Sequence, residues 1–244
     1  MSDKTIFIYE DGIGSVSLVD HMGSDITIVN SARVSFGVTK DELDRRDRKL
    51  IDYLIRHRHT STFEHNVITY KFVVPLFVRS QHHRHRTWSY NEISRRYTDK
   101  YMSFYTPSKF RTQHKSNRQA SNPDELIDPS IKKDVAMTIV PITYPKASEM
   151  YSEHCDRSLE LFDSLIEAGV CREQARGVLP QTMYTEYYGT VNLNNLLKFV
   201  DLRTHEGAQW EIQKVAEACL EIAKGLFPVA IESYMRIRDE ARSA

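Results

Sequence analysis

Hydrophobic and polar positions follow two different periods along this chain, and each period predicts a different element. Residues 66–74 alternate strictly, which predicts a strand with one buried face made of Ile68, Tyr70, Phe72 and Val74. Residues 40–58 instead repeat apolar side chains at helical spacing, which predicts an amphipathic helix. Thr39 and Glu42 resemble a capping box and place the start of this helix near residue 40.

The same patterns predict the remaining secondary structure. Further strands are expected at 6–9, 15–19 and 182–191. Further helices are expected at 24–33, 147–168, 172–179, 192–202, 207–224 and 229–240. Strands and helices do not alternate regularly, so the order favours an α+β (mixed α/β) fold, with a central sheet flanked by helices, over a doubly wound sheet.

One segment has no sustained period. Residues 106–145 contain five prolines and many serine, asparagine and lysine residues, which is typical of a long irregular excursion and not of a domain. Two interpretations of this segment remain open: it could form a lid beside a site, or it could be disordered. The chain is therefore expected to form a single domain, residues 1–244, with this excursion at about 106–145.

Composition narrows the class of protein. Hydrophobic residues make up 41% of the 244 residues and charged residues 27%, which predicts a soluble globular protein. No apolar run approaches 18 residues and no leader is evident, so we expect neither a membrane span nor secretion. Three widely spaced cysteines fit a reducing cytoplasm. A net charge of zero argues against a general nucleic-acid binder.

Residues 79–97 hold the densest group of basic side chains. Five arginines and three histidines fall in this stretch, although the whole chain carries no net charge. Arginine presents a planar fork suited to phosphate and to heterocycle edges, and Glu92 offers an acceptor for ribose hydroxyls. This mix favours an anionic, nucleotide-like ligand. A solvated charged surface is the alternative, and interleaved apolar side chains argue against it: Trp88, Tyr90, Ile93 and Tyr97.

A second histidine-rich stretch, residues 56–65, raises the question of a metal site. His59 and His65 are six residues apart, and the chain lacks the His-Glu-x-x-His spacing that places two ligands on one helical face. Arg56 and Arg58 would also repel a cation. No metal is expected there, and exposed or hydrogen-bonded histidines are the favoured interpretation.

The order of residues from Arg84 to Tyr97 is specific. It fits the pattern Arg-His-Arg-x-x-Ser-x-Asn-Glu-x-Ser-x-Arg-Tyr at every fixed position, and it resembles the signature of the flavin-dependent thymidylate synthases. Other segments extend the resemblance over most of residues 5–230: 32–36, 62–65, 175–180, 190–192, 202–203 and 208–213.

The resemblance implies a reaction and an assembly. The reaction is reductive methylation of deoxyuridylate (dUMP) to dTMP, with 5,10-methylenetetrahydrofolate as carbon donor, FAD as hydride carrier and NADPH as reductant. The implied assembly is a homotetramer of an α/β fold with sites at subunit junctions. Arg84 and Glu92 would then come from one subunit and Arg203 from another.

The resemblance also implies the site residues, position by position. Those expected to contact dUMP are Gln81, Arg84, Glu92, Ser94, Arg96, Arg176 and Arg203. Those expected to contact FAD are Ser61, Arg84, His85, Arg86, Glu92, Asn192, Asn194 and Lys198. The chain has no G-x-G-x-x-G fingerprint, so FAD is not expected to be bound in the Rossmann manner. Arg203 is the principal catalytic candidate, expected to stabilise a pyrimidine ionised at N3, with Glu92 and Ser94 beside it.

Two other hypotheses remain. Cys171, next to Arg172 and near a helix start, could act as the nucleophile of a classical folate-dependent thymidylate synthase. Alternatively, the arginines of residues 79–97 could bind RNA or nucleotides, with Trp88, Tyr90 and Tyr97 as stacking platforms.

Overall fold

The computed structural model describes residues 4–100, 102–132 and 144–243, and their contacts group them into two compact units. The first, here called the sheet unit, comprises residues 1–73, 81–92 and 186–244. The second, here called the α5 unit, comprises residues 74–80 and 93–185. Each is described by itself below.

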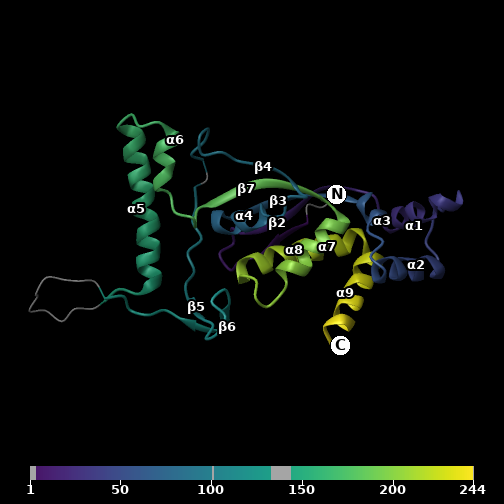
Figure 1. Ribbon diagram of the computed structural model, residues 1–244. Helices are drawn as coiled ribbons and strands as arrows, with labels where there is room; N and C mark the ends of the chain where they lie inside the picture. The colour runs from purple at the N-terminus through teal and green to yellow at the C-terminus, as the bar shows by residue number, and fades with distance from the viewer. Residues whose placement is uncertain (1–3, 101, 133–143, 244) are drawn as a thin grey trace, which may run out of the picture. The chain divides into compact units, whose positions relative to one another are not determined.

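A five-stranded sheet forms the frame of the sheet unit (Figure 1). Its strand order is β1-β2-β3-β7-β4, and the β1–β2, β2–β3 and β7–β4 pairs are antiparallel. The strands span Thr5–Phe7 (β1), Ser15–Met22 (β2), Val67–Pro75 (β3), Tyr184–Asn192 (β7) and Ser89–Glu92 (β4). The predicted strands are confirmed, and the mixed α/β class with them.

Strand β3 shows why the alternation in the sequence predicted one buried face. Ile68, Tyr70, Phe72 and Val74 are each completely buried, while the residues between them keep some exposure. The hydroxyl of Tyr70 donates to the Cys219 carbonyl oxygen of α8 at 3.0 Å, so this face of the sheet packs against that helix.

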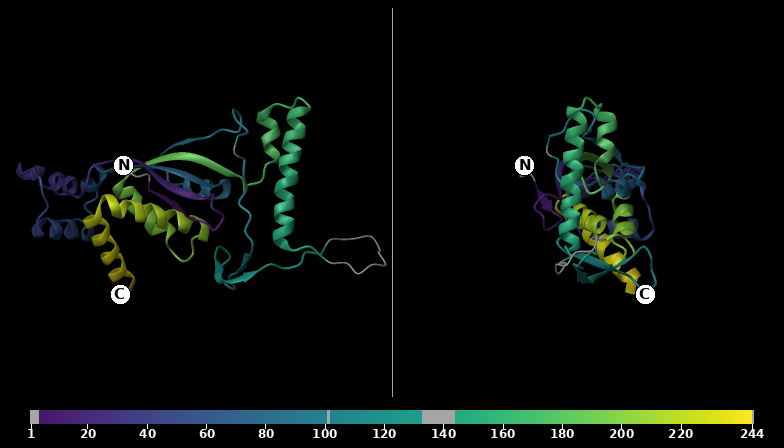
Figure 2. Two further views of the ribbon diagram at one scale, coloured as in Figure 1. Left: turned by 180° about the vertical axis from the view of Figure 1, so that it is seen from behind. Right: turned by 90° about the vertical axis from the view of Figure 1, so that its left-hand side faces the viewer.

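Three helices follow β7, the last strand in the sequence. They are α7 (Leu193–Arg203), α8 (Trp210–Leu226) and α9 (Pro228–Ser243), as predicted apart from small shifts at their ends. Figures 1 and 2 show α7 and α8 on one side of the strands. Within the described ranges, no helix is both long enough and apolar enough to cross a lipid bilayer.

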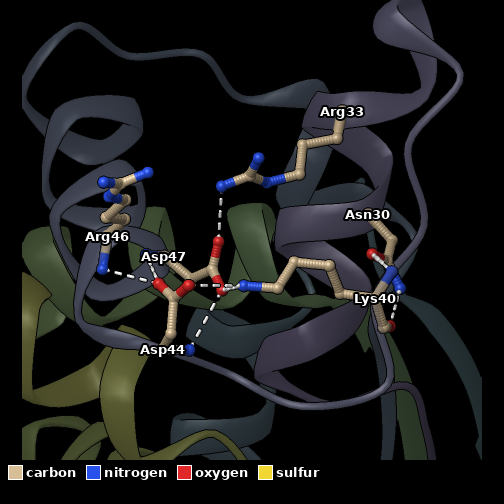
Figure 3. A network of polar contacts seen from close by, with 6 residues as sticks. All are labelled: Asn30, Arg33, Lys40, Asp44, Arg46 and Asp47. Atoms are coloured by element: carbon tan, nitrogen blue, oxygen red, sulfur yellow. Dashed lines mark hydrogen bonds and ion pairs between the residues drawn. The ribbon is translucent and has the colours of Figure 1, made fainter.

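Two N-terminal helices, α1 (Asp25–Arg33) and α2 (Arg45–Arg56), precede the short α3 (Ser61–Glu64). The predicted start of α2 near residue 40 is wrong, because Asp44 caps it and Asp47 completes the capping box. The completely buried carboxylate of Asp47 also pairs with Arg33, at 2.6 Å, and with Lys40 (Figure 3). These bonds hold the chain before Asp44 in a non-helical path.

The α5 unit contains α5 (Ala147–Glu167), α6 (Arg172–Ala175), a 3-10 turn at Arg176–Val178 and most of α4 (Leu76–His82). Gly169, with a φ of 87°, ends α5 as predicted. The small core of this unit consists of Phe162, Ala175, Leu179 and Met183.

The excursion at 106–145 is less irregular than expected. Strands β5 (Phe110–Gln113) and β6 (Ser121–Ile127) pair antiparallel within it, with a register irregularity after Arg111. The sequence did not predict this hairpin, because its strands are too short to show a clear alternation of apolar and polar residues. Pro123, a residue that argues against a strand, also lies within β6 itself. Residues 133–143 lie outside the described part of the chain.

Candidate active site

The basic stretch forms a tight turn between α4 and β4. His85 N–H donates to the His82 carbonyl oxygen at 2.9 Å, and Trp88 N–H donates to the His85 carbonyl oxygen at 3.3 Å. The Tyr90 hydroxyl lies 2.9 Å from the first of these oxygens and 3.1 Å from the second. The turn is therefore fixed by its own backbone and by one tyrosine.

Beneath the turn lies an aromatic cluster. His82 is completely buried, and its Nδ1 is 2.7 Å from the Tyr187 hydroxyl oxygen. Phe72, Trp88 and Phe199 pack around the His82 ring. Burial, and then the neighbouring His85, hold the pKa of His82 well below its usual value, so this ring is neutral. The turn thus packs against a cluster of uncharged side chains.

Arg203, at the end of α7, reaches this turn. Its Nε donates to His85 Nε2 at 3.0 Å, and its Nη2 donates to the Gln81 carbonyl oxygen at 3.2 Å. Burial, followed by the charge of Arg203, lowers the pKa of His85 to about 4. This contact lies within one chain. The sharing of sites between subunits that the resemblance implied stays a prediction.

The other predicted residues of this turn differ in surroundings. The Gln81 amide donates to Gln209 Oε1 at 2.5 Å, at the start of α8. Arg84 and Arg86 are exposed, and their side chains make no hydrogen bond or ion pair to any residue that the structure describes. Glu92 is half-buried at the end of β4, opposite Tyr187 of β7. The two arginines are therefore available to an anionic ligand.

The predicted FAD residues of α7 border a pocket of about 540 Å³ in the sheet unit. Asn194, which is buried, donates to Glu64 Oε1 at 2.8 Å, and the exposed Lys198 lies one turn further along α7. The pocket has a basic rim and an apolar wall. The rim consists of Arg58, His59, Lys198, Arg238 and Arg242, and the wall of Leu54, Ile55, Phe63, Leu197, Tyr234 and Ile237.

The sequence did not reveal this pocket. Arg58 adopts a φ of 54° at the end of α2, in the left-handed region where glycine is usual, and its side chain lines the pocket. Arg238 and Arg242 come from the last helix, so only folding brings them to α2 and α7. One signal was the run of four basic residues at 56–59, whose histidines we interpreted as exposed or hydrogen-bonded.

The remaining FAD candidates, Ser61 and Asn192, lie at helix starts. Ser61 is exposed at the beginning of α3. The Asn192 side chain accepts a hydrogen bond from Asn195 N–H at 2.9 Å and caps α7. Both lie in the sheet unit, as do the turn and the pocket.

Three of the predicted dUMP residues belong to the α5 unit: Ser94, Arg96 and Arg176. Ser94 Oγ accepts a hydrogen bond from Arg96 N–H at 3.3 Å in a turn that follows β4. Arg96 is exposed and lies over the Tyr97 ring, and Arg176 is exposed on the 3-10 turn. The structure thus brings Gln81, His85 and Arg203 together in one unit, and Ser94 and Arg96 together in the other.

The alternative hypotheses gain little from this geometry. Trp88 is buried and Tyr90 partly so, which leaves Tyr97 as the exposed one of the three aromatic rings proposed to stack on RNA. Cys171 is exposed, whereas Cys155 and Cys219 are buried. Among the described residues, no group of three or more histidine, cysteine, aspartate or glutamate side chains could hold a metal ion.

Comparison with known proteins places these features in a family. Residues 17–229 match the family described as thymidylate synthase complementing protein. A flavin-dependent thymidylate synthase of Thermus thermophilus is 44% identical over 217 residues, covering 89% of this chain and 74% of that protein. A flavin-dependent thymidylate synthase of Pseudothermotoga lettingae is 38% identical over 228 residues, covering 93% of this chain and 92% of that protein.

A solved structure agrees with these matches. A UMP/dUMP methylase of Streptomyces cacaoi bound with 5-Br dUMP has a TM-score of 0.74 at 31% identity, covering 91% of this chain and 94% of that one. The fold and the relatives together define a flavin-dependent methyltransferase. Within that class, the chain belongs to the flavin-dependent thymidylate synthase family, which confirms the resemblance of its Arg84–Tyr97 signature.

Proposed function

We propose that this enzyme methylates dUMP at C5 of the pyrimidine to give dTMP. The carbon comes from 5,10-methylenetetrahydrofolate, and the reducing equivalents pass from NADPH through FAD. Family membership supports this reaction. The observation that carries our assignment of the site is the contact of Arg203 with the turn after α4, since it places a guanidinium beside the basic signature.

Arg203 stabilises the activated pyrimidine in this proposal. Attack from C5 requires electron density on that carbon, and removal of the N3 proton supplies it. A guanidinium stays protonated and is not the base. It can instead donate charge-assisted hydrogen bonds to the imide anion. The two bonds to the turn use Nε and Nη2 of Arg203, so neither of them occupies Nη1.

The nucleotide contacts are assigned by charge. A monophosphate dianion needs guanidinium forks and hydroxyl or backbone donors. We propose that Arg84, Arg96 and Arg176 supply the cations, and that Ser94 supplies a hydroxyl. All three arginines are exposed. Gln81 and Glu92 would recognise the remaining polar edges, because an amide and a carboxylate can pair with uracil and ribose groups.

The chain's donor set fits FAD. The 540 Å³ pocket combines five basic side chains with an apolar wall, and its carboxylate, Asp201, already accepts a hydrogen bond from Tyr234 at 2.5 Å. Such a pocket suits a ligand with phosphates and aromatic rings. We propose that Asn194 and Lys198 bind FAD in this pocket and that Ser61 and Asn192 contact it outside the pocket. The turn would add Arg84, His85, Arg86 and Glu92. When bound, FAD supplies the hydride that completes the methyl group.

We further propose a cytoplasmic homotetramer. Its sites would form where subunits meet, so that the phosphate-binding arginines and the flavin pocket need not come from a single chain. NADPH and folate act as co-substrates in this scheme, and no residue is assigned to either.

Replacement of Arg203 tests the proposed site. Arg203→Ala is expected to fold and to bind FAD but to lose methyl transfer by about 10²- to 10³-fold, as for other single donors directed at developing charge. Arg203→Lys should recover little, because one ammonium cannot reproduce a planar fork. Flavin reduction by NADPH should stay near normal in both variants. Stopped-flow flavin reduction is measured beside dTMP formation at saturating dUMP.

A matched control shows whether the effect of Arg203→Ala is specific to Arg203 or follows from the loss of any arginine side chain. Arg236 is exposed on α9 and pairs with Asp52 and Glu240, so Arg236→Ala should leave both half-reactions intact. If Arg203→Ala slows flavin reduction and methyl transfer equally, Arg203 is structural. If it slows neither, its assignment to the pyrimidine is wrong.

A further inference from the structure

We propose that His85 is a positioning residue for Arg203, in addition to the flavin contact that the family resemblance implies. Arg203 Nε donates to His85 Nε2 at 3.0 Å, and Nη2 donates to the Gln81 carbonyl oxygen at 3.2 Å. Two anchored nitrogens fix both the reach and the plane of a guanidinium that would otherwise rotate freely. This inference rests on the proposed function, because it takes Arg203 as the residue that meets the pyrimidine.

The contact dictates the tautomer of His85. Arginine offers only donors, so His85 Nε2 must accept the bond and the ring must carry its proton on Nδ1. A neutral ring is therefore required. A protonated His85 would lose the acceptor and would place a second positive charge beside Arg203.

The surroundings keep His85 in the required state and place. The charged or titratable groups beside its ring are Arg203 from α7 and His82 from the turn, while Phe199 of α7 meets the ring edge-on at 4.8 Å between centroids. The Tyr90 hydroxyl, 3.1 Å from the His85 carbonyl oxygen, fixes the backbone. Burial and the positive Arg203 lower the pKa of His85 to about 4, so the acceptor persists through neutral pH.

Two substitutions distinguish positioning from other roles. In His85→Gln the amide oxygen can reach the place of Nε2 and accept from Arg203, whereas in His85→Asn the shorter side chain reaches only the place of Nδ1. The FAD-loaded enzyme is titrated with dUMP, and the dissociation constant is read from the change in flavin absorption. FAD affinity and kcat are measured separately. We expect His85→Asn to weaken dUMP binding about tenfold and to lower kcat, and His85→Gln to bind dUMP several-fold more tightly than His85→Asn does, whatever effect the two variants share on FAD.

A double-mutant cycle assigns the effect to Arg203. In the Arg203→Ala background, His85→Asn should weaken dUMP binding no further, because the residue it positions is absent. The proposal is overturned if the Gln and Asn variants are equally impaired, if the Asn effect persists without Arg203, or if only FAD affinity changes. Failure of the proposed function looks different, since the native enzyme itself would then neither bind nor methylate dUMP. If instead Arg203→Ala binds and methylates dUMP normally, the role of Arg203 at the pyrimidine and the positioning role of His85 are both wrong.

Discussion

The three cysteines differ in exposure, and this bears on the mechanism. Cys219 is completely buried in α8, and burial raises the pKa of its thiol well above the usual value. Cys155 is 2% exposed and lies 3.5 Å from the Thr182 hydroxyl. A buried neutral thiol is a poor nucleophile, because the thiolate is the reactive form. Cys171 is exposed and is thus the only accessible thiol among the described residues.

Because the proposed mechanism assigns no role to a thiol, we expect a chain with all three cysteines changed to alanine to keep substantial methyl transfer. Any loss should follow stability, since removing the buried Cys219 sulfur costs roughly 1 kcal/mol for the small cavity left behind. Cys171→Ala alone should change neither activity nor unfolding. dTMP formation and urea unfolding are measured for each variant. A folded, FAD-loaded Cys171→Ala enzyme without turnover would restore the cysteine mechanism.

At the scale of elements, the buried Asp47 carboxylate organises the start of α2. It accepts the Asp44 backbone N–H at 3.0 Å, completing the capping box, and it pairs with Arg33 of α1 and with Lys40. Burial acts to raise the pKa of Asp47, but the Lys40, Asp44 and Arg33 bonds outweigh it and the pKa is lowered. One side chain thus joins two helices and the chain between them (Figure 3).

Asp47→Ala is expected to reduce the free energy of unfolding by about 2–3 kcal/mol, since it removes a buried acceptor and leaves two cations without their anion. The loss stays moderate because Arg33 and Lys40 keep about a quarter of their side chains in water. Asp44→Ala is the control, because it removes the exposed cap but keeps the buried carboxylate, and it should cost less. Urea unfolding compares the two. An equal loss would mean that burial of Asp47 adds nothing to the cap.

In the whole molecule, the proposed site residues are divided between the two compact units. Arg203 contacts His85 within a single chain, whereas Ser94 belongs to the other compact unit. Sites at subunit junctions would allow Ser94 and Arg203 of one site to be supplied by different chains.

Mixed oligomers test this arrangement. Inactive Ser94→Ala and Arg203→Ala subunits, exchanged and reassembled, should recover part of the dTMP-forming activity. A mixture of His85→Asn with Arg203→Ala should not, because these two side chains act as one pair within a chain. Subunit exchange is verified by native mass spectrometry. Absence of recovery in the first mixture would place Ser94 and Arg203 of each site in the same chain.

Elements that depend on local residue patterns were predictable from the amino-acid sequence. The alternation at 66–74 predicted β3 because side chains of a strand point to opposite faces in turn, and one face is buried here. Gly169 marked the end of α5 because a left-handed residue there favours glycine. The signature at Arg84–Tyr97 identified the family because fixed residue types at fixed spacing leave few alternatives.

Only the tertiary structure decided contacts between residues far apart in the sequence. Asp25, at the start of α1, accepts the backbone N–H groups of Val229 and Ala230 at 2.9 Å each, and so caps the distant helix α9. Arg203 and His85 are 118 positions apart, and no pattern in either segment predicts their bond. The sequence predicted a capping box at Thr39 and Glu42, but the box that forms is the one at Asp44 and Asp47. The second forms because Arg33 and Lys40 supply buried Asp47 with counter-charges, and burial is a property of the fold.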